Sequence, residues 1–285
     1  MPLKQCCATG SLHTGTPTGK LGKIHGLECY TAEASGDPKG IIVIIPDAFG
    51  LSLANNKILA DDYAKNGFTV YLPDFMEGIE LPEGILLSMK AFTATGLWNQ
   101  LYKIAHALYI ARYVIPWMYY NRKAVARPKI FKWLQDLRKN EAANLPLGVA
   151  GFCWGGQHVV ELCWNEQKTP DGKRLVDCGF TAHPSMLVYP GDIDKVILPL
   201  SIAASEHDPQ MSPENAKQTE EILKGKTAKT KDEGIVHEFV MYQGAHHGFA
   251  VRADEEDKEE AARGKKAEEQ AVAWFSRWFK DVPKV

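Results

Sequence analysis

Long apolar runs are missing from this chain of 285 residues. No stretch reaches the roughly 18 uninterrupted apolar residues of a membrane-spanning helix. The most apolar segment, 97–120, is interrupted by Lys103, His106, Arg112 and Pro116. The opening residues also lack the apolar core of a secretory signal. We therefore expect a cytoplasmic protein without a membrane partner.

An excess of charge of one sign is missing as well. The net charge is -2, so no global basic field favours nucleic acid as a partner. Six cysteines in a chain of this length, without a secretory signal, indicate reduced thiols rather than a disulfide framework. No set of His, Cys and carboxylate residues has the spacing of metal ligands, so we expect no metal. The oligomeric state is left open.

The chain instead contains short apolar runs that alternate with helical patterns. At 45% hydrophobic and 24% charged residues, it can bury a core without disulfides. Strands are expected at 41–45, 68–72, 147–151, 179–182, 198–203 and 238–242. Helices are expected at 55–66, after Cys153, after Ser212 and at the C-terminus, and residues 1–23 should wrap the surface. The alternation predicts a single α/β domain over residues 1–285, with a mainly parallel central sheet and helices on both faces.

Residues 85–140 stand apart because aromatic and aliphatic side chains are dense there. From Trp98 to Arg112 these side chains fall near helical spacing. One interpretation is a helix packed on the sheet followed by a loop, and we favour it for the first half. The other is a lid or insertion over a pocket, and for Tyr113 to Tyr120 both interpretations stand.

The strongest chemical signal is Gly151-Phe152-Cys153-Trp154-Gly155, between a short apolar strand and a helical stretch. It has the G-x-nucleophile-x-G pattern of a nucleophile elbow, with Cys in place of the usual Ser. The tight turn needs residues without side chains two positions before and two positions after the nucleophile, where a side chain would clash with the neighbouring strand and helix. It also places the thiol at a helix N-terminus, where exposed N–H groups stabilise a thiolate. The alternative is a buried cysteine in a glycine-rich turn.

The partners of such a nucleophile follow it in the expected order, an acid and then a histidine. Asp208 comes directly after the predicted strand 198–203, and His247 comes after the strand 238–242. His246 competes with His247 for the role of base, and Glu206 and His207 compete less well with Asp208. His183 also ends a strand and could line the pocket, although a packing role explains it more simply.

This constellation predicts acyl transfer to sulfur. A thiolate at Cys153 attacks an activated ester, lactone or thioester, and water activated by His247 then hydrolyses the acyl-enzyme. Asp208 would fix the imidazole tautomer. The oxyanion hole would use the backbone N–H of Trp154, after the nucleophile, and that of Ala48, after the first buried strand.

Several segments together resemble the dienelactone hydrolase family, in the form of its eukaryotic members. They are Pro46-Asp47-Ala48-Phe49-Gly50, Tyr71-Leu72-Pro73-Asp74-Phe75, Gly151-Phe152-Cys153-Trp154-Gly155-Gly156, Ala182-His183-Pro184-Ser185, His207-Asp208 and His247-Gly248-Phe249-Ala250-Val251-Arg252. The resemblance covers most of the chain. It implies an α/β-hydrolase fold, a Cys-His-Asp triad and no cofactor. It also selects His247 over His246, because the family's histidine directly precedes a small residue and Phe.

Two further site residues are implied only by this resemblance. Asp47 stands where bacterial members carry a Glu that hydrogen-bonds the resting thiol, and a loop-capping carboxylate is its alternative. Arg252 stands one residue beyond the place of an Arg that holds the substrate carboxylate. A second family Arg has no counterpart here, so the resemblance does not fix dienelactone as the substrate.

The sequence therefore predicts an enzyme that hydrolyses small carboxylic esters or lactones through a cysteine acyl-enzyme. The partner would be the small-molecule ester or lactone itself. An acyl transferase or thioesterase on the same residues is one alternative, and a non-catalytic ligand-binding member of the fold is another.

Overall fold

The computed structural model describes residues 13–93, 97–230, 232 and 234–281. These residues form one eight-stranded sheet in the order β1-β2-β4-β3-β5-β6-β7-β8. The strands are β1 (Lys20–Ile24), β2 (Leu27–Ala32), β3 (Ile41–Ile45), β4 (Thr69–Pro73), β5 (Leu147–Phe152), β6 (Cys178–Ala182), β7 (Leu200–His207) and β8 (Glu238–His246). In this order, every neighbouring pair from β4 to β8 is parallel. The pairs β1–β2 and β2–β4 are antiparallel. The predicted mainly parallel sheet is confirmed.

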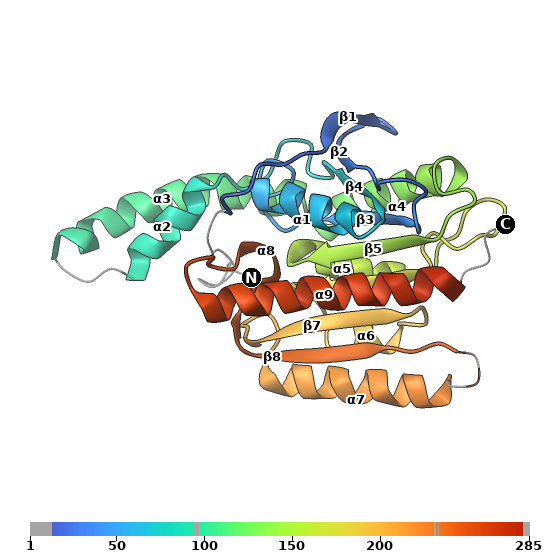
Figure 1. Cartoon of the computed structure of the whole chain (residues 1–285). Helices are drawn as coiled ribbons and strands as arrows, with labels where there is room; N and C mark the ends of the chain where they lie inside the picture. The colour runs from blue at the N-terminus through green and yellow to red at the C-terminus, as the bar shows by residue number, and fades with distance from the viewer. Residues whose placement is uncertain (1–12, 94–96, 231, 233, 282–285) are drawn as a thin grey trace.

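Helices cover both faces of the sheet, with α1 and α9 in front of it in Figure 1 and α4 and α5 behind. Their bounds are α1 (Ala54–Lys65), α2 (Gly84–Thr93), α3 (Leu97–Tyr120), α4 (Lys123–Lys139), α5 (Trp154–Leu162), α6 (Gly191–Asp194), α7 (Pro213–Lys229), α8 (Phe249–Arg252) and α9 (Lys258–Asp281). On the α9 face, the Phe275 ring meets Phe68 and Phe180 edge to face at 6.4 and 6.5 Å. On the α4 side, Trp133 meets Tyr71 at 6.3 Å. These aromatic contacts fasten the helices to the sheet.

The predicted strands are all present, with shifted ends. Ile41–Ile45 has the predicted bounds, and every one of its residues is buried, as a strand covered on both faces requires. The strands β7 and β8 end at His207 and His246, beyond the predicted 203 and 242. They run further because they continue to pair with each other as far as His207 opposite His246. The strand ends were predicted too early because the extension contains polar residues, and the prediction relied on continuous apolar runs.

The prediction that residues 1–23 wrap the surface is wrong for its last part. Residues 20–24 form the edge strand β1, which pairs antiparallel with β2 across the two-residue turn His25-Gly26. Both turn residues have positive φ, 46° and 87°, as a two-residue hairpin of matching twist needs. The signal was the glycine between two short alternating runs. Residues 1–12 lie outside the described part of the chain.

The helices α2 and α3 form an arm that projects away from the sheet (Figure 1). The predicted helix around Trp98 to Arg112 exists within α3, but the expectation that it packs on the sheet is wrong. Ile104 and Leu108 are 66% and 69% exposed, because this half of α3 extends past the body and contacts α2 instead. The side chains of Phe92, Trp98 and Leu101 lie outside the described part of the structure.

Nearer the body, residues 113–120 are helical, and they reach the core. Val114 and Trp117 are buried there, while Ile115 between them is 66% exposed. Within the described residues, no helix, α3 included, has the length and apolar character needed to cross a membrane.

The start of α5 packs so closely on the end of β3 that position 155 admits only glycine. A Cβ there would lie 2.0 Å from the carbonyl oxygen of Ile45. Gly155→Ala should therefore lower the free energy of unfolding by about 3 kcal/mol or more, as measured by urea denaturation. Gly225, within α7, has open space around its Cα. Gly225→Ala should raise stability by roughly 0.5–1 kcal/mol, and equal effects at both positions would contradict the close approach.

Candidate active site

Cys153 occupies the sharp turn between β5 and α5. Its backbone has φ 51° and ψ -113°, a conformation that is strained for a residue with a side chain. Two backbone hydrogen bonds hold it: Cys153 N–H donates to Ala182 at 3.3 Å, and Ser185 N–H donates to the Cys153 carbonyl at 2.9 Å. A Cβ at Gly151 would lie 2.6 Å from the Gly155 oxygen. The glycines thus permit the turn, and the end of β6 fixes it.

Four side chains from the carboxyl ends of neighbouring strands form a continuous polar chain. The Cys153 Sγ lies 3.3 Å from Ser185 Oγ, which lies 3.4 Å from His247 Nε2. On the other side of the ring, His247 Nδ1 lies 2.9 Å from each carboxylate oxygen of Asp208. All four residues are at least 94% buried. The structure therefore brings together the three residues that the sequence nominated as a triad.

Asp208 is held as a carboxylate that faces the imidazole. The Ser205 hydroxyl and the Gln210 backbone N–H each donate to it at 2.8 Å. Burial alone would raise the pKa of Asp208, but His247 and these donors outweigh it and hold that pKa below its usual value. The carboxylate thus fixes the Nδ1–H tautomer and leaves Nε2 to face the sulfur.

The neighbours of the His247 imidazole favour its protonated form. Burial lowers the pKa of His247, but the adjoining Cys153 sulfur and the Asp208 carboxylate outweigh burial and raise that pKa well above its usual value. A hydrogen bond to Cys153 contributes to this effect. The ring is therefore suited to accept a proton.

Ser185 is a site residue that the sequence reasoning did not nominate. Its segment was noticed only as part of the family resemblance. The strand order makes the ends of β5 and β6 neighbours, which was a usable signal. The direction of the Ser185 side chain depends on His183, whose φ of 40° turns the chain after β6. No periodic pattern in the sequence reveals such a turn.

His183 packs beneath His247 and is not among the residues that line the pocket. Its ring is fully buried and meets His247 edge to face at 4.9 Å and Phe249 at 5.8 Å. Neither ring nitrogen has a hydrogen-bond partner within the described residues. Burial lowers the pKa of His183 well below its usual value, and the charge of His247 adds to this shift. His183 is therefore a neutral support under the imidazole.

Asp47 and Arg252 form a fully buried ion pair with each other. The Phe49 backbone N–H and the Asn56 amide also donate to Asp47, each at 3.2 Å, and the Arg252 guanidinium lies 5.0 Å from the Phe49 ring centre. Neither residue is among those that line the pocket. The pair joins the loop after β3 to α8 and so fixes the two loops that flank the site.

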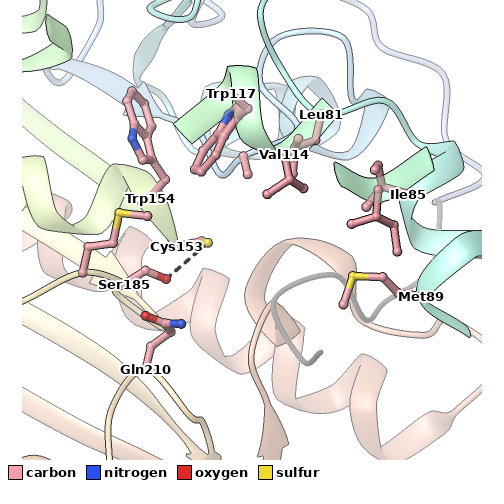
Figure 2. A pocket seen from close by; sticks show the side chains of 12 residues that line it. Leu81, Ile85, Met89, Val114, Trp117, Cys153, Trp154, Ser185 and Gln210 are labelled. Carbon is pink, nitrogen blue, oxygen red and sulfur yellow. Dashed lines mark hydrogen bonds between the residues drawn. The ribbon is translucent and has the colours of Figure 1, made fainter. Parts of the chain in front are cut away.

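An apolar pocket opens beside the Cys153 sulfur (Figure 2). With its open mouth it encloses about 550 Å³. Its lining residues are Ala48, Leu81, Ile85, Met89, Ile110, Val114, Trp117, Cys153, Trp154, Ser185, Met186 and Gln210. Ala48 and Trp154, the two predicted oxyanion donors, both line this pocket together with Cys153. The α2–α3 arm supplies much of the wall, through Ile85, Met89, Ile110, Val114 and Trp117.

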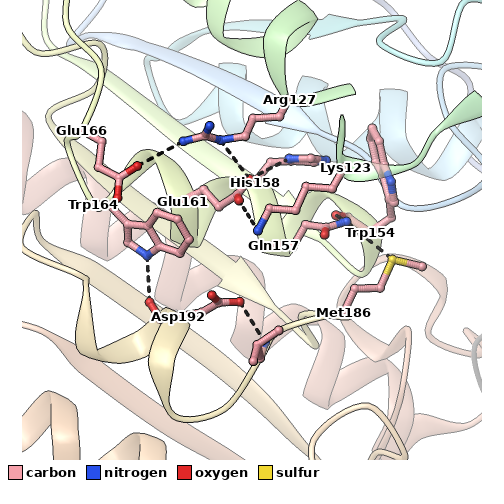
Figure 3. Close-up of polar contacts among 11 residues, drawn as sticks. Lys123, Arg127, Trp154, Gln157, His158, Glu161, Trp164, Glu166, Met186 and Asp192 are labelled. Carbon is pink, nitrogen blue, oxygen red and sulfur yellow. Dashed lines mark hydrogen bonds and ion pairs between the residues drawn. The ribbon is translucent and has the colours of Figure 1, made fainter. Parts of the chain in front are cut away.

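Trp154 is braced from behind by a buried polar cluster on α5 (Figure 3). Its indole N–H donates to the Asn121 carbonyl at 3.0 Å, and the His158 ring meets it edge to face at 4.8 Å. His158 in turn contacts Glu161 at 3.3 Å, which pairs with Lys123. Burial raises the pKa of Glu161, but His158 and Lys123 outweigh it and lower that pKa. His158 therefore has a structural role beneath Trp154.

No three His, Cys, Asp or Glu side chains in the described part of the chain converge in the way metal ligands would.

A sequence model of the dienelactone hydrolase family matches residues 27–280. The chain belongs to this family. Among its relatives, it is 27% identical to Hydrolase pyvD from Aspergillus violaceofuscus over 281 residues, and 28% identical to Hydrolase tropI from Talaromyces stipitatus over 282 residues. These alignments cover 98% or more of all the chains involved. Dienlactone hydrolase 1 from Gibberella moniliformis is 25% identical over 284 residues, covering 98% of this chain and 95% of the relative.

Solved structures of dienelactone hydrolases share the fold. A putative dienelactone hydrolase from Klebsiella pneumoniae superposes with a TM-score of 0.62 at 14% identity, covering 92% of this chain and 99% of the other. A soluble variant of monoglyceride lipase from Saccharomyces cerevisiae gives 0.57 at 10% identity, covering 94% and 97%. The predicted α/β-hydrolase fold is confirmed, and this family member is a hydrolase.

The buried His183 ring should make this dienelactone hydrolase family member lose stability in mild acid. Because the folded-state pKa of His183 is depressed, only the unfolded chain takes up a proton as the pH falls below about 6.5. Between about pH 7.5 and 5.5, the free energy of unfolding should therefore fall by about 1.4 kcal/mol less in His183→Phe than in the wild type. Urea unfolding at the two pH values measures this. His158 and His237, whose pKa values burial also lowers, are present in both proteins, so an identical loss in both would refute the assignment.

Proposed function

We propose that this hydrolase cleaves small carboxylic esters or lactones through an acyl-enzyme on Cys153, with His247 as base and Asp208 as its orienting carboxylate. The observation that carries the proposal is the buried polar chain from the sulfur through Ser185 and His247 to Asp208, set at the wall of an apolar pocket. The hydrolase names of the full-length relatives support the reaction class.

In the first half of the reaction, His247 Nε2 takes the thiol proton and the sulfur of Cys153 attacks the ester carbonyl carbon. The developing oxyanion is stabilised by the backbone N–H groups of Trp154 and Ala48. When the tetrahedral intermediate collapses, the carbonyl carbon–oxygen bond to the leaving group breaks. The leaving alkoxide takes the proton from His247 and departs as an alcohol. A thioester on Cys153 remains.

In the second half, a water molecule gives a proton to His247 and its oxygen attacks the thioester carbonyl. Collapse breaks the carbon–sulfur bond and releases the acid, and the imidazolium returns its proton to the sulfur. Asp208 stabilises the imidazolium in both halves and is not itself protonated.

The thiol of Cys153 should be the group that becomes acylated. Burial raises the pKa of the other described thiols, that of Cys29 to about 12 and those of Cys163 and Cys178 well above the usual value. Brief reaction with p-nitrophenyl acetate, acid quench and peptide mass mapping should therefore locate the acetyl group on Cys153. Cys153→Ala should lose at least about a thousandfold in kcat, because the covalent route is gone, whereas Cys163→Ala should keep most of it.

The same assay separates the two neighbouring histidines. His247→Ala should lose far more activity than His246→Ala, since only His247 contacts Asp208 and Ser185. Acetylation elsewhere, or undiminished turnover by a folded Cys153→Ala protein, would end the proposal.

Ser185 should assist the transfer by linking the sulfur to the imidazole. Ser185→Ala removes a hydrogen bond to charged groups, which is worth about 1.5–3 kcal/mol. It should lower kcat/KM for p-nitrophenyl acetate by roughly tenfold to a hundredfold and shift the acidic limb of the pH–rate profile. Ser201 is another buried serine. Its hydroxyl donates a hydrogen bond of 2.6 Å to Glu238, and it is not among the residues that line the pocket. Ser201→Ala should leave the profile in place, and matching profiles for Ser185→Ala and wild type would exclude the role.

A further inference from the structure

The lining of the pocket differs from what a carboxylate-bearing substrate requires. Among the described residues that line it, none is an acidic residue, a lysine, an arginine or a histidine. Leu81, Ile85, Met89, Ile110, Val114, Trp117 and Met186 supply apolar side chains. Apart from Cys153 itself, the polar side chains are those of Ser185 and Gln210. A carboxylate placed here would lose its hydration without gaining a cation, which is strongly unfavourable.

Arg252, the residue nominated to hold a substrate carboxylate, already has a carboxylate partner. Its guanidinium pairs with Asp47, and both side chains are 0% exposed. To turn toward a substrate, it would have to leave the Asp47 carboxylate charged in the interior without its cation, which is costly. The pair therefore works as a fixed part of the framework and adds no charged group to the described lining of the pocket.

The apolar residues also define a direction away from the sulfur. In Figure 2, Val114 and Trp117 lie beside the space next to Cys153, and Ile85 and Met89 lie at its far end. Ile85 is 1% exposed and Val114 is 9% exposed. A straight acyl chain held as a thioester on Cys153 would therefore run along α3 toward α2.

We propose that this pocket is an acyl site for uncharged, straight apolar chains of short to medium length, and that it rejects acyl groups ending in a carboxylate. The inference rests on the proposed function, because it takes the carbonyl carbon to lie at the Cys153 sulfur. Each added methylene that the pocket removes from water should raise kcat/KM, by up to about fourfold. The projecting arm thus sets the specificity of the enzyme.

The first test compares four p-nitrophenyl esters with the wild-type enzyme: acetate, butyrate, hexanoate and the monoester of adipic acid. The last two have the same chain length and differ by a terminal carboxylate. We expect kcat/KM to rise at least about tenfold from acetate to hexanoate, and the adipate monoester to react at least about a hundredfold more slowly than the hexanoate. Equal rates for acetate and hexanoate, or a preference for the adipate monoester, would overturn the inference.

A pair of adjacent residues on α3 supplies the matched variants. Val114 lines the pocket, whereas Ile115 is 66% exposed. Val114→Phe should fill the acyl space and lower kcat/KM for hexanoate at least about tenfold more than for acetate. Ile115→Phe should leave both values unchanged. An equal loss of kcat/KM for both esters in Val114→Phe would also overturn the inference, because the pocket would then not discriminate between acyl chains of different length.

A third variant tests whether the pocket prefers an uncharged chain end to a carboxylate because its lining offers no cation. Met89 lines the far end of the pocket and is only partly buried, so an arginine there can keep its charge hydrated. Met89→Arg should raise the ratio of adipate-monoester to hexanoate kcat/KM at least about tenfold. No change in this ratio in a folded variant would count against the assigned direction of the chain.

The two proposals fail in different ways. If mass mapping finds no acyl group on Cys153 with any of the four esters, the proposed function is wrong. If Cys153 is acylated but neither chain length nor terminal charge alters kcat/KM, only the acyl-site inference is wrong.

Discussion

The site depends on the close approach of the first turn of α5 to the end of β3. Glycine at position 155 allows this approach, because any side chain there would meet the Ile45 carbonyl. The approach places the Cys153 turn directly above the sheet edge. It also brings the start of α5, with Trp154, next to the loop after β3, which holds Ala48. One steric constraint thus positions the proposed nucleophile and both proposed oxyanion donors.

Local chemistry explains what the sequence could predict. Buried strands such as Ile41–Ile45 are continuous apolar runs, and the G-x-C-x-G turn requires its glycines for backbone reasons alone. Asp208 and His247 were nominated because strand ends in a parallel sheet meet at one edge. Fold class, turn and the three nominated residues therefore follow from short stretches of sequence that can be interpreted independently of one another.

Features that depend on contacts between distant segments could not be predicted. The direction of Ser185 follows from the turn at His183, and the pairing of Asp47 with Arg252 joins residues from opposite parts of the chain. The family resemblance suggested roles at the site for both charged residues, whereas the structure commits them to each other. The prediction that the helix at 98–112 packs on the sheet was wrong, because helical spacing of apolar residues shows that a helix forms but not what lies against it. Its outer half leaves Ile104 and Leu108 in water.

The pairing of Asp47 with Arg252 spans 205 residues, and its consequence concerns biosynthesis. A ribosome completes β3, the elbow and the sulfur long before it releases the segment that carries the imidazole. Until α8 docks against the loop after β3, the nascent chain holds Cys153 without its proposed base, and it holds the Asp47 carboxylate without Arg252. If Cys153 is the nucleophile, as proposed, its activation therefore has to wait until the C-terminal quarter of the polypeptide completes the site.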